Sequence, residues 1–233
     1  MKIPRILHQT WRNEDIPEEF RHMAQSWREQ HSAWEYVFWT DEENRNFIKR
    51  HFAFFLPIYD NYPNNIQRVD AVRYFVLYKI GGCYIDIDFE CLANIEPLLK
   101  DARCVFGKEP VEHCLIHNKP LIISNAFMGA VPRFHFFEHL CCELMQGRKV
   151  TDHPNDRVLE STGPFMLSRL YQEYEKKEEV DLLEADLIYP LTKTELDSWN
   201  SGMGDQGIRQ KLENAYGLHH YAGTWWKKKK TVL

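Results

Sequence analysis

The sequence feature that most constrains the fold is a helix-patterned segment that passes through two glycines into a strand-patterned segment. In residues 66–80, apolar side chains recur at the three-to-four-residue spacing of one helix face. The glycines at 81–82 allow a tight turn that a β-carbon would obstruct. In an extended chain over residues 83–89, Asp86 and Asp88 face one side and the neighbouring isoleucines face the other. The segment therefore predicts a helix, a tight turn and a strand that carries two carboxylates at its end.

The rest of the chain alternates between strand-like and helix-like patterns. We expect strands at residues 3–8, 35–39, 104–107, 121–127, 188–191 and 218–221, and helices at 17–30, 41–50, 134–145, 164–177 and 206–214. Asp41 is a suitable N-cap for the helix that follows it. Such alternation predicts an α/β fold with a mostly parallel central sheet covered on both faces. Because no repeat or linker interrupts the sequence, residues 1–233 are expected to form a single domain.

Composition excludes two classes of protein. The 233 residues include 29 Lys and Arg against 34 Asp and Glu, which gives a net charge of −5, and 44% of the residues are apolar. A chain with this apolar content can bury a sizeable core, so it is not a disordered protein. The mild acidity argues against a nucleic-acid partner, because binding to a phosphate backbone normally requires an excess of basic residues.

No segment near the N-terminus has the apolar length of a signal peptide, and no apolar run is long enough to span a bilayer. The six cysteines lack C-x-x-C spacing and are interpreted as reduced. We therefore expect a cytoplasmic protein. Residues 226–233 form a basic tail in which Trp226 precedes Lys227–Lys230. This composition suits either peripheral contact with an anionic membrane surface or a solvated tail.

The two aspartates offer a pair of hard oxygen ligands. Asp86 and Asp88 suit Mg²⁺ or Mn²⁺ rather than Zn²⁺, because no Cys/His set accompanies them. In an open α/β sheet, ligands bind beyond the carboxyl ends of the strands, which is where this pair is expected. Asp70 and Arg73 are three residues apart and share one face of the preceding helix. Two interpretations stay open for them: part of the same site, or an ordinary ion pair at the surface.

These residues resemble a known family. The patterns R-x-D-x-x-R-Y at 68–74 and G-G-x-Y-x-D-x-D at 81–88 resemble the sugar-binding Asp-x-Asp region of glycosyltransferase family 32, which includes fungal inositol-phosphoceramide mannosyltransferases. Further family-like segments lie in the expected order along the chain: IPRILHQTW at 3–11, NAF at 125–127, STGP at 161–164 and HHYAGTW at 219–225, where Thr224 replaces a serine. The resemblance therefore extends over nearly the whole sequence.

The resemblance implies a GT-A fold, a Rossmann-like architecture that binds a nucleotide-sugar donor, together with Mn²⁺ or Mg²⁺. It implies that Asp86 contacts the donor and the metal, and that Asp88 ligates the metal directly. It also implies that His220, in preference to His219, reaches the metal or the diphosphate.

The resemblance assigns the remaining site residues to the donor and the acceptor. Asp70 and Arg73 are expected to hold hydroxyls of the donor sugar, and Asn125 to stabilise the reacting sugar or orient the acceptor. The residues expected around the nucleotide base and the diphosphate are Leu7, His8, Gln9, Trp11 and Trp225.

The resemblance therefore implies a metal-dependent, retaining glycosyltransferase that moves a hexose from a nucleotide sugar to a glycan or glycolipid, and a UDP-sugar is favoured over GDP-mannose as donor. A divalent ion would neutralise the diphosphate leaving group, so an acidic protein can bind an anionic donor. Two alternatives are a metal-dependent phosphoryl hydrolase, with Asp86 as nucleophile and Asp88 as acid, and a catalytically inactive glycan-binding module.

Overall fold

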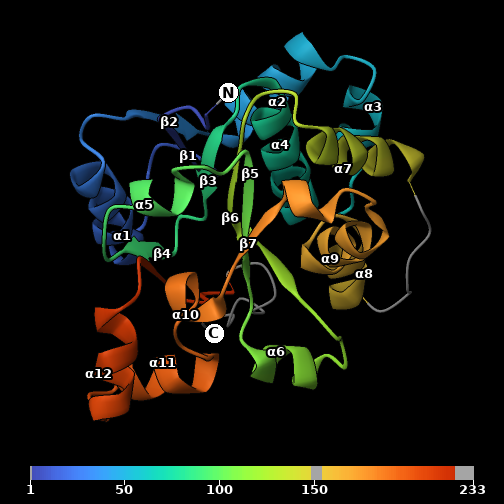
Figure 1. Ribbon diagram of the computed structural model, residues 1–233. Helices are drawn as coiled ribbons and strands as arrows, with labels where there is room; N and C mark the ends of the chain where they lie inside the picture. The colour runs from blue at the N-terminus through green and yellow to red at the C-terminus, as the bar shows by residue number, and fades with distance from the viewer. Residues whose placement is uncertain (1, 148–153, 224–233) are drawn as a thin grey trace, which may run out of the picture.

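A six-stranded mixed sheet runs through the centre of the computed structural model, which describes residues 2–147 and 154–223 (Figure 1). The strands, in sheet order, are β2 (Glu35–Trp39), β1 (Ile6–Thr10), β3 (Gly82–Ile85), β6 (Ile123–Ala130), β5 (Cys104–Lys108) and β7 (Asp181–Leu183). Strand β6 runs antiparallel to both of its neighbours, and the other adjacent strands are parallel. The predicted α/β fold with a mostly parallel sheet is therefore confirmed.

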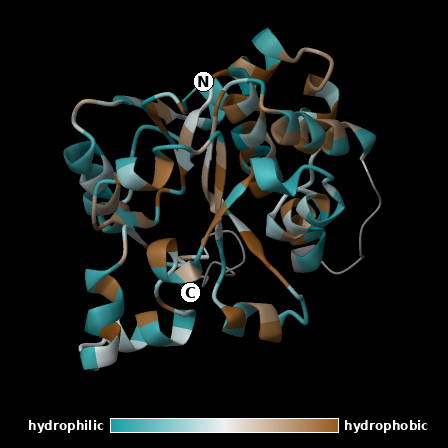
Figure 2. Cartoon of the chain, viewed as in Figure 1, coloured by the Kyte–Doolittle hydropathy of each residue, from teal (hydrophilic) through white to brown (hydrophobic). Residues whose placement is uncertain are grey.

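Helices cover both faces of this sheet. They are α1 (Glu18–Gln30), α2 (Asp41–His51), α3 (Leu56–Asp60), α4 (Asn65–Lys79), α5 (Glu96–Leu99), α6 (Val111–Ile116), α7 (His135–Gln146), α8 (Pro154–Ser161), α9 (Pro164–Glu173), α10 (Ala185–Ile188), α11 (Lys193–Asn200) and α12 (Gln206–Glu213), with a 3₁₀ turn, η1, at Lys177–Glu179. In Figure 1, α4, α7 and α9 lie on one side of the sheet, and α1 and α5 lie on the other. Figure 2 shows that hydrophobic residues follow the central strands, and the large side chains of Trp27, Tyr74 and Phe106 are fully buried.

Helix α4 and strand β3 form the predicted helix–glycine–strand unit. The helix begins where the Gln67 side chain accepts a hydrogen bond from the backbone N–H of Asn64 (3.3 Å). It ends where the N–H of Gly81 donates to the carbonyl of Leu77 (2.9 Å). Gly81 and Gly82 have φ angles of 75° and 96°, which glycine adopts readily because it has no β-carbon. The chain thereby turns back, and β3 packs beside α4.

Gly82→Ala is expected to destabilise the fold by about 2–3 kcal/mol, because strain at a positive φ adds to a steric clash. The new β-carbon would lie 2.7 Å from the carbonyl oxygen of Ile6. Gly202→Ala is the matched control: the φ of Gly202 is 77°, but nothing lies within 4 Å of a β-carbon there. Its expected cost is about 1 kcal/mol. Urea unfolding measures both values, and equal costs would contradict the steric explanation.

The strand predicted over residues 83–89 is interrupted by a turn. Strand β3 ends at Ile85, and β4 (Phe89–Cys91) pairs with β8 (Gly217–His219) in a separate two-stranded sheet. The turn closes where the N–H of Phe89 donates to the carbonyl of Asp86 (3.2 Å). The local alternation of side chains cannot reveal this break, because the partner strand of β4 lies far along the chain.

Two other predicted boundaries shift for local reasons. The first strand begins at Ile6 rather than at residue 3, and Pro4 has no N–H to donate to a sheet ladder. Helix α2 is capped by Thr40 rather than by Asp41, since the Thr40 hydroxyl accepts a hydrogen bond from the N–H of Glu43 (3.2 Å).

The strand predicted at residues 188–191 is wrong, because Ile188 is the last residue of helix α10. Ile188, Tyr189 and Leu191 are almost fully buried, and this apolar run has the composition of a strand without forming one. The sequence patterns also missed the short elements α3, α5, α6, α8, α11 and β7. The six cysteines are free thiols, as their spacing indicates. In the part of the chain that the structure describes, no helix combines the length and apolar content that a membrane span requires.

Candidate functional site

A cavity of about 1040 Å³ opens at the carboxyl ends of the parallel strands. Trp11 follows β1, Asp41 follows β2, Asp86 follows β3 and Glu109 follows β5, and all four residues line the cavity. Strand β6 runs in the opposite direction, so it contributes Asn125 from near its start. This position agrees with the general placement of ligand sites in open α/β sheets.

Arg73 lies between two carboxylates at this cavity. Its guanidinium is 3.1 Å from Asp70 Oδ1 and 3.1 Å from Asp86 Oδ1, and only 2% of its side chain is exposed. It also donates to the carbonyl of Asn125 (2.7 Å) and lies over the ring of Tyr84, 4.5 Å from the ring centre. Burial alone would lower the pKa of Arg73, but Asp86 and Asp70 raise it, so the guanidinium stays charged. The interpretation of Asp70 and Arg73 as a surface ion pair is therefore wrong.

Asp70 is held from three directions. Besides its contact with Arg73, Asn125 Nδ2 donates to Oδ1 (3.0 Å) and the Thr162 hydroxyl donates to Oδ2 (3.0 Å). Burial raises the pKa of Asp70 to about 6, and Arg73 opposes that rise. At neutral pH the carboxylate is therefore mostly ionised, and its orientation is set by neighbouring side chains.

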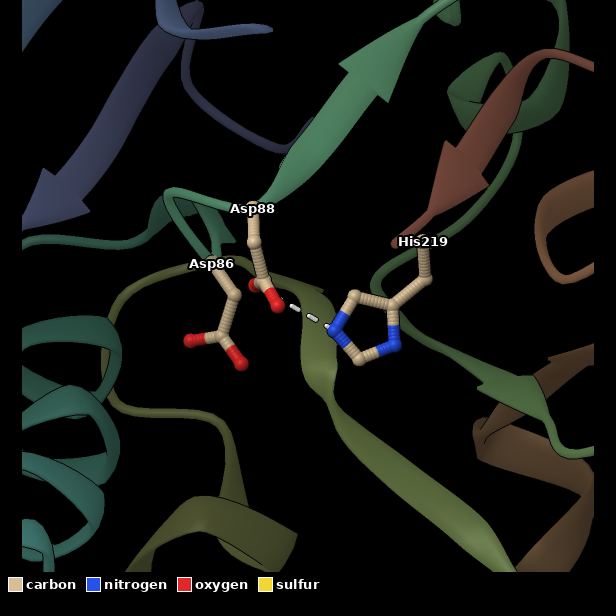
Figure 3. A group of neighbouring side chains, drawn as sticks. All are labelled: Asp86, Asp88 and His219. Carbon is tan, nitrogen blue, oxygen red and sulfur yellow. Dashed lines mark ion pairs between the residues drawn. The ribbon is translucent and has the colours of Figure 1, made fainter. Parts of the chain in front are cut away.

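Asp86, Asp88 and His219 form a compact cluster at the same cavity (Figure 3). Their ligand atoms all lie within 4.8 Å of one another. Nε2 of His219 is 3.3 Å from Asp88 Oδ1, and the N–H of Ala222 donates to Asp88 Oδ2 (2.8 Å). The pairing of β4 with β8 creates the cluster, because it places His219 opposite Phe89, whose ring stacks on the imidazole.

The chemistry of this donor set fits a divalent cation. Two carboxylate oxygens are the ligands that hard cations bind, and an imidazole nitrogen can complete the set. Asp86 is already oriented for this role, because the Tyr84 hydroxyl donates to its Oδ1 (2.9 Å) and Arg73 contacts the same atom. Hydrogen bonds of this kind fix the position of metal-binding carboxylates.

The pH dependence of stability reports on Asp88. Burial alone would raise the pKa of Asp88, but His219 and the N–H of Ala222 lower it to about 2. A carboxylate whose pKa falls on folding stabilises the protein above its unfolded pKa of about 4, and this effect is lost as the pH falls toward 2. In metal-free protein, Asp88→Asn is expected to cost about 2 kcal/mol at pH 6 and about half as much at pH 3. Chemical unfolding at both pH values measures the cost, and a cost independent of pH would contradict this assignment.

The histidine beside the aspartates is His219, and not His220, which was the expected ligand. His220 Nε2 lies 3.1 Å from Glu90 Oε2. Neighbouring residues of an extended chain face opposite sides, so one of the two histidines faces the site and the other faces away from it. Sequence alone leaves open which one does.

Three residues expected at the nucleotide base do not line the cavity. Leu7, His8 and Gln9 are buried within the sheet. His8 donates from Nε2 to the carbonyl of Gly81 (2.9 Å), and burial lowers the pKa of His8 to about 4. Gln9 Nε2 donates to the carbonyl of Asp86 (3.2 Å). The His8 side chain therefore supports the glycine turn at residues 81–82, and the Gln9 side chain supports the turn that begins at Asp86.

The other predicted residues divide into two groups. Trp11, Asp70, Arg73 and Asn125 all line the cavity. Trp225, Trp226 and Lys227–Lys230 lie outside the described residues.

Sequence reasoning missed four residues that the structure brings to this region. Tyr84 and Thr162 hold the two aspartates, and both belong to the family-like motifs without having been assigned a role. Glu109 and His113 form a contact at the cavity. Their four-residue spacing could have indicated a pair on one turn of helix, but that signal is common and weak.

Comparison with known proteins identifies related sequences. Residues 17–105 match the family described as the glycosyltransferase sugar-binding region containing DXD motif. The chain is 39% identical over 175 residues to inositol phosphoceramide mannosyltransferase 2 of Schizosaccharomyces pombe, and the aligned region covers 75% of this chain and 48% of the relative. It is 38% identical over 174 residues to mannosyl phosphorylinositol ceramide synthase SUR1 of Saccharomyces cerevisiae, and the aligned region covers 75% of this chain and 43% of the relative. The chain thus spans about half the length of these curated relatives.

Two solved structures are similar in fold. PaToxG glycosyltransferase superimposes with a TM-score of 0.51 at 14% identity, covering 91% of this chain and 79% of that one. Mouse xyloside xylosyltransferase 1 superimposes with a TM-score of 0.50 at 13% identity, covering 95% and 98%. At such low identity the likeness concerns the fold alone, which is the expected GT-A fold. From the family match, the curated relatives and this fold, we conclude that the chain belongs to the glycosyltransferases that share the DXD-containing sugar-binding region, in agreement with its resemblance to family 32.

Proposed function

We propose that this chain transfers a hexose from a nucleotide sugar to a hydroxyl group of an acceptor, in a metal-dependent reaction that retains the anomeric configuration. The observation that carries the proposal is the cluster of Asp86, Asp88 and His219, which lies in one cavity with Asp70 and Arg73. A cation site next to charged sugar-binding groups is the arrangement that a diphosphate sugar requires.

We propose Mn²⁺ as the cation, ahead of Mg²⁺. Mg²⁺ is bound almost entirely through oxygen, whereas an imidazole nitrogen is a more usual ligand of transition metals. The candidate set combines two carboxylates with the His219 imidazole. When bound, the cation would stabilise the negative charge that develops on the leaving diphosphate.

The residues of the chain hold the sugar while this charge develops. Asp70 is ionised and fixed by Asn125 and Thr162, so it can accept hydrogen bonds from sugar hydroxyls. Arg73 lies between Asp70 and Asp86, at 3.1 Å from each, and its positive charge offsets the repulsion between the two carboxylates.

Retention is proposed through a front-face route. The acceptor oxygen forms its bond to the anomeric carbon while the bond from that carbon to the phosphate oxygen breaks. The electron pair stays on the phosphate oxygen, which then takes the proton of the acceptor hydroxyl. This route requires close positioning of the two substrates and no covalent intermediate on the protein.

A glycolipid is the acceptor that we favour over a free glycan. The names of the two curated relatives refer to inositol phosphoceramide and to mannosyl phosphorylinositol ceramide, and both of these compounds contain a ceramide. On this chain, Ile116 lines the cavity although 76% of it is exposed, and Val111 and Leu115 beside it on α6 are also exposed. An exposed apolar rim at the mouth of a polar cavity suits a substrate that has a polar head and an apolar tail.

The donor is proposed as a UDP-hexose or GDP-mannose. The sequence analysis favours UDP, but the names of both relatives contain a mannosyl group, which supports a mannose donor. UDP-hexoses and GDP-mannose are therefore both included in the first assay.

The test incubates the protein with Mn²⁺ and a panel of UDP-hexoses and GDP-mannose, with inositol phosphoceramide in mixed micelles or octyl hexosides as acceptors. Nucleotide release and product formation are followed, and NMR of the product reports the anomeric configuration. We expect one donor to be consumed only when Mn²⁺ is present. Hydrolysis of simple phosphate esters without use of any sugar donor would favour the phosphoryl hydrolase, and donor binding without turnover would favour an inactive glycan-binding module.

We also propose that the protein is cytoplasmic and contacts a membrane surface through the basic tail. Each lysine near an anionic surface contributes on the order of 1 kcal/mol. Replacing Lys227–Lys230 by serine is therefore expected to reduce binding to phosphatidylserine vesicles by at least about tenfold at low salt. Co-sedimentation with these vesicles measures the effect, and equal binding of the two proteins would contradict this role of the tail.

A further inference from the structure

The arm that connects β5 to β6 carries a second polar pair at the cavity. Glu109 follows β5, and His113 lies on α6 one helical turn later. Nδ1 of His113 is 2.7 Å from Glu109 Oε2, and 15% and 12% of the respective side chains are exposed. Both residues line the same cavity as the aspartate cluster.

The Glu109 carboxylate is ionised and has capacity for a further hydrogen bond. Burial alone would raise the pKa of Glu109, but His113, His219 and Ser124 lower it. Two carboxylate oxygens offer about four acceptor positions, and His113 Nδ1 donates to one of these oxygens, Oε2. A largely buried carboxylate that faces a cavity with unused acceptor positions is suited to bind a hydroxyl group.

The orientation of His113 supports this arrangement. The backbone N–H of Lys193 points to His113 Nε2 at 3.4 Å, so Nε2 acts as an acceptor and the proton is assigned to Nδ1. Nδ1–H then donates to Glu109 and holds the carboxylate in place. The start of α11 thus fixes the imidazole, and the imidazole fixes the carboxylate.

Glu109 lies near the cation cluster but is not part of it. It lines the same cavity as Asp86, Asp88 and His219, although the group of three candidate ligands does not include it. Glu109 therefore faces the same space as the cation cluster, from a segment separate from the residues that would hold the donor. The same arm carries exposed Ile116, which lies at the apolar rim described for a lipid acceptor.

We propose that Glu109 binds the acceptor, by accepting a hydrogen bond from a ring hydroxyl next to the attacking one, and that His113 is a positioning residue for Glu109. The acceptor class is then a ring with adjacent hydroxyls, such as a hexose or an inositol. This inference rests on the proposed function. A charge-assisted hydrogen bond to a second hydroxyl fixes the angle at which the attacking oxygen approaches the anomeric carbon.

The test compares Glu109→Gln with the wild type in transfer to inositol phosphoceramide in mixed micelles or, if that is not used, to octyl hexosides. We expect the KM for the acceptor to rise about 10- to 100-fold, since an ionised hydrogen-bond acceptor is lost, while the KM for the donor changes by less than about threefold. Glu184→Gln is the matched control. Its carboxylate pairs with Lys108, next to Glu109 in sequence, but it does not line the cavity. The KM for the acceptor and the KM for the donor of this control should both stay within about threefold of the wild-type values.

A second pair of variants tests the positioning role of His113. His113→Phe removes the donor to Glu109 and should raise the KM for the acceptor by about tenfold. His113→Asn places an N–H near the position of Nδ1, so it should restore most of the acceptor affinity. A purely structural role would not give this rescue, because asparagine fills the space of the imidazole less well than phenylalanine does. If circular dichroism shows that Glu109→Gln is unfolded, the two His113 variants decide whether Glu109 binds the acceptor.

The outcomes separate this inference from the proposed function. If the wild type consumes no nucleotide sugar, the proposed function fails. If the wild type transfers sugar but Glu109→Gln matches Glu184→Gln, or its loss lies in the KM for the donor, only the role of Glu109 is overturned. Donor hydrolysis without transfer to either acceptor would overturn the acceptor class.

Discussion

Replacing Asp88 with asparagine is expected to lower the rate of glycosyl transfer by about 10²–10³-fold, because a charge that would hold the cation is lost. The amide keeps the size of the side chain, but it no longer offers a second negative oxygen ligand beside Asp86 and His219. It also loses the ion pair with His219 (3.3 Å). Initial rates at saturating donor and calorimetric titration with Mn²⁺ measure the effect on turnover and on cation affinity.

Glu90→Gln is the matched control for this experiment. Glu90 follows Asp88 by two residues, its side chain is 32% exposed, and it pairs with His220 outside the cation cluster. Its loss should change the rate by no more than about threefold. Equal rates in the two variants would remove Asp88 from the site. A loss of turnover in Asp88→Asn with unchanged Mn²⁺ affinity would assign Asp88 to the donor instead of the cation.

The parts of the fold that could be predicted from the sequence are those encoded by short-range patterns. The apolar stripe of α4 and the glycines at 81–82 predict a helix that turns directly into a strand, and both are present. The spacing of Asp70 and Arg73 places them on one helix face, and they do meet, at 3.1 Å. Each of these predictions depends on residues that are close in sequence, so backbone geometry alone determines the outcome.

The parts that could not be predicted depend on pairing between distant segments. The pairing of β4 with β8 selects His219 over His220, and nothing within either segment encodes that choice. The burial of Asp70 and Arg73 likewise depends on segments that are distant in sequence. The spacing of Asp70 and Arg73 is also common in surface ion pairs, and this pair is buried because Tyr84, Asn125 and Thr162 contact it from other segments of the chain. A charged pair of this kind becomes costly to disrupt only because of its tertiary surroundings.

Arg73→Met is therefore expected to destabilise the metal-free protein by about 3–5 kcal/mol, since it leaves two buried or half-buried carboxylates without their cation. The guanidinium contacts Asp70 and Asp86 at 3.1 Å each, and it also donates to the carbonyl of Asn125. Arg73→Lys keeps the charge but cannot reach all these partners with one planar group, so an intermediate loss is expected. Denaturant unfolding of each variant measures the free energy of unfolding.

Arg45→Met provides the comparison that makes this result interpretable. Arg45 contacts both oxygens of Asp60 (2.8 and 2.7 Å), but their side chains are 48% and 39% exposed. Solvent screens that pair, so its loss should cost no more than about 1 kcal/mol. The two arginines make carboxylate contacts of similar length, and the difference between the variants isolates the effect of burial. If Arg73→Met cost no more than Arg45→Met, water would have to reach the carboxylates of Asp70 and Asp86, and the argument for a pre-organised, desolvated sugar site would fail.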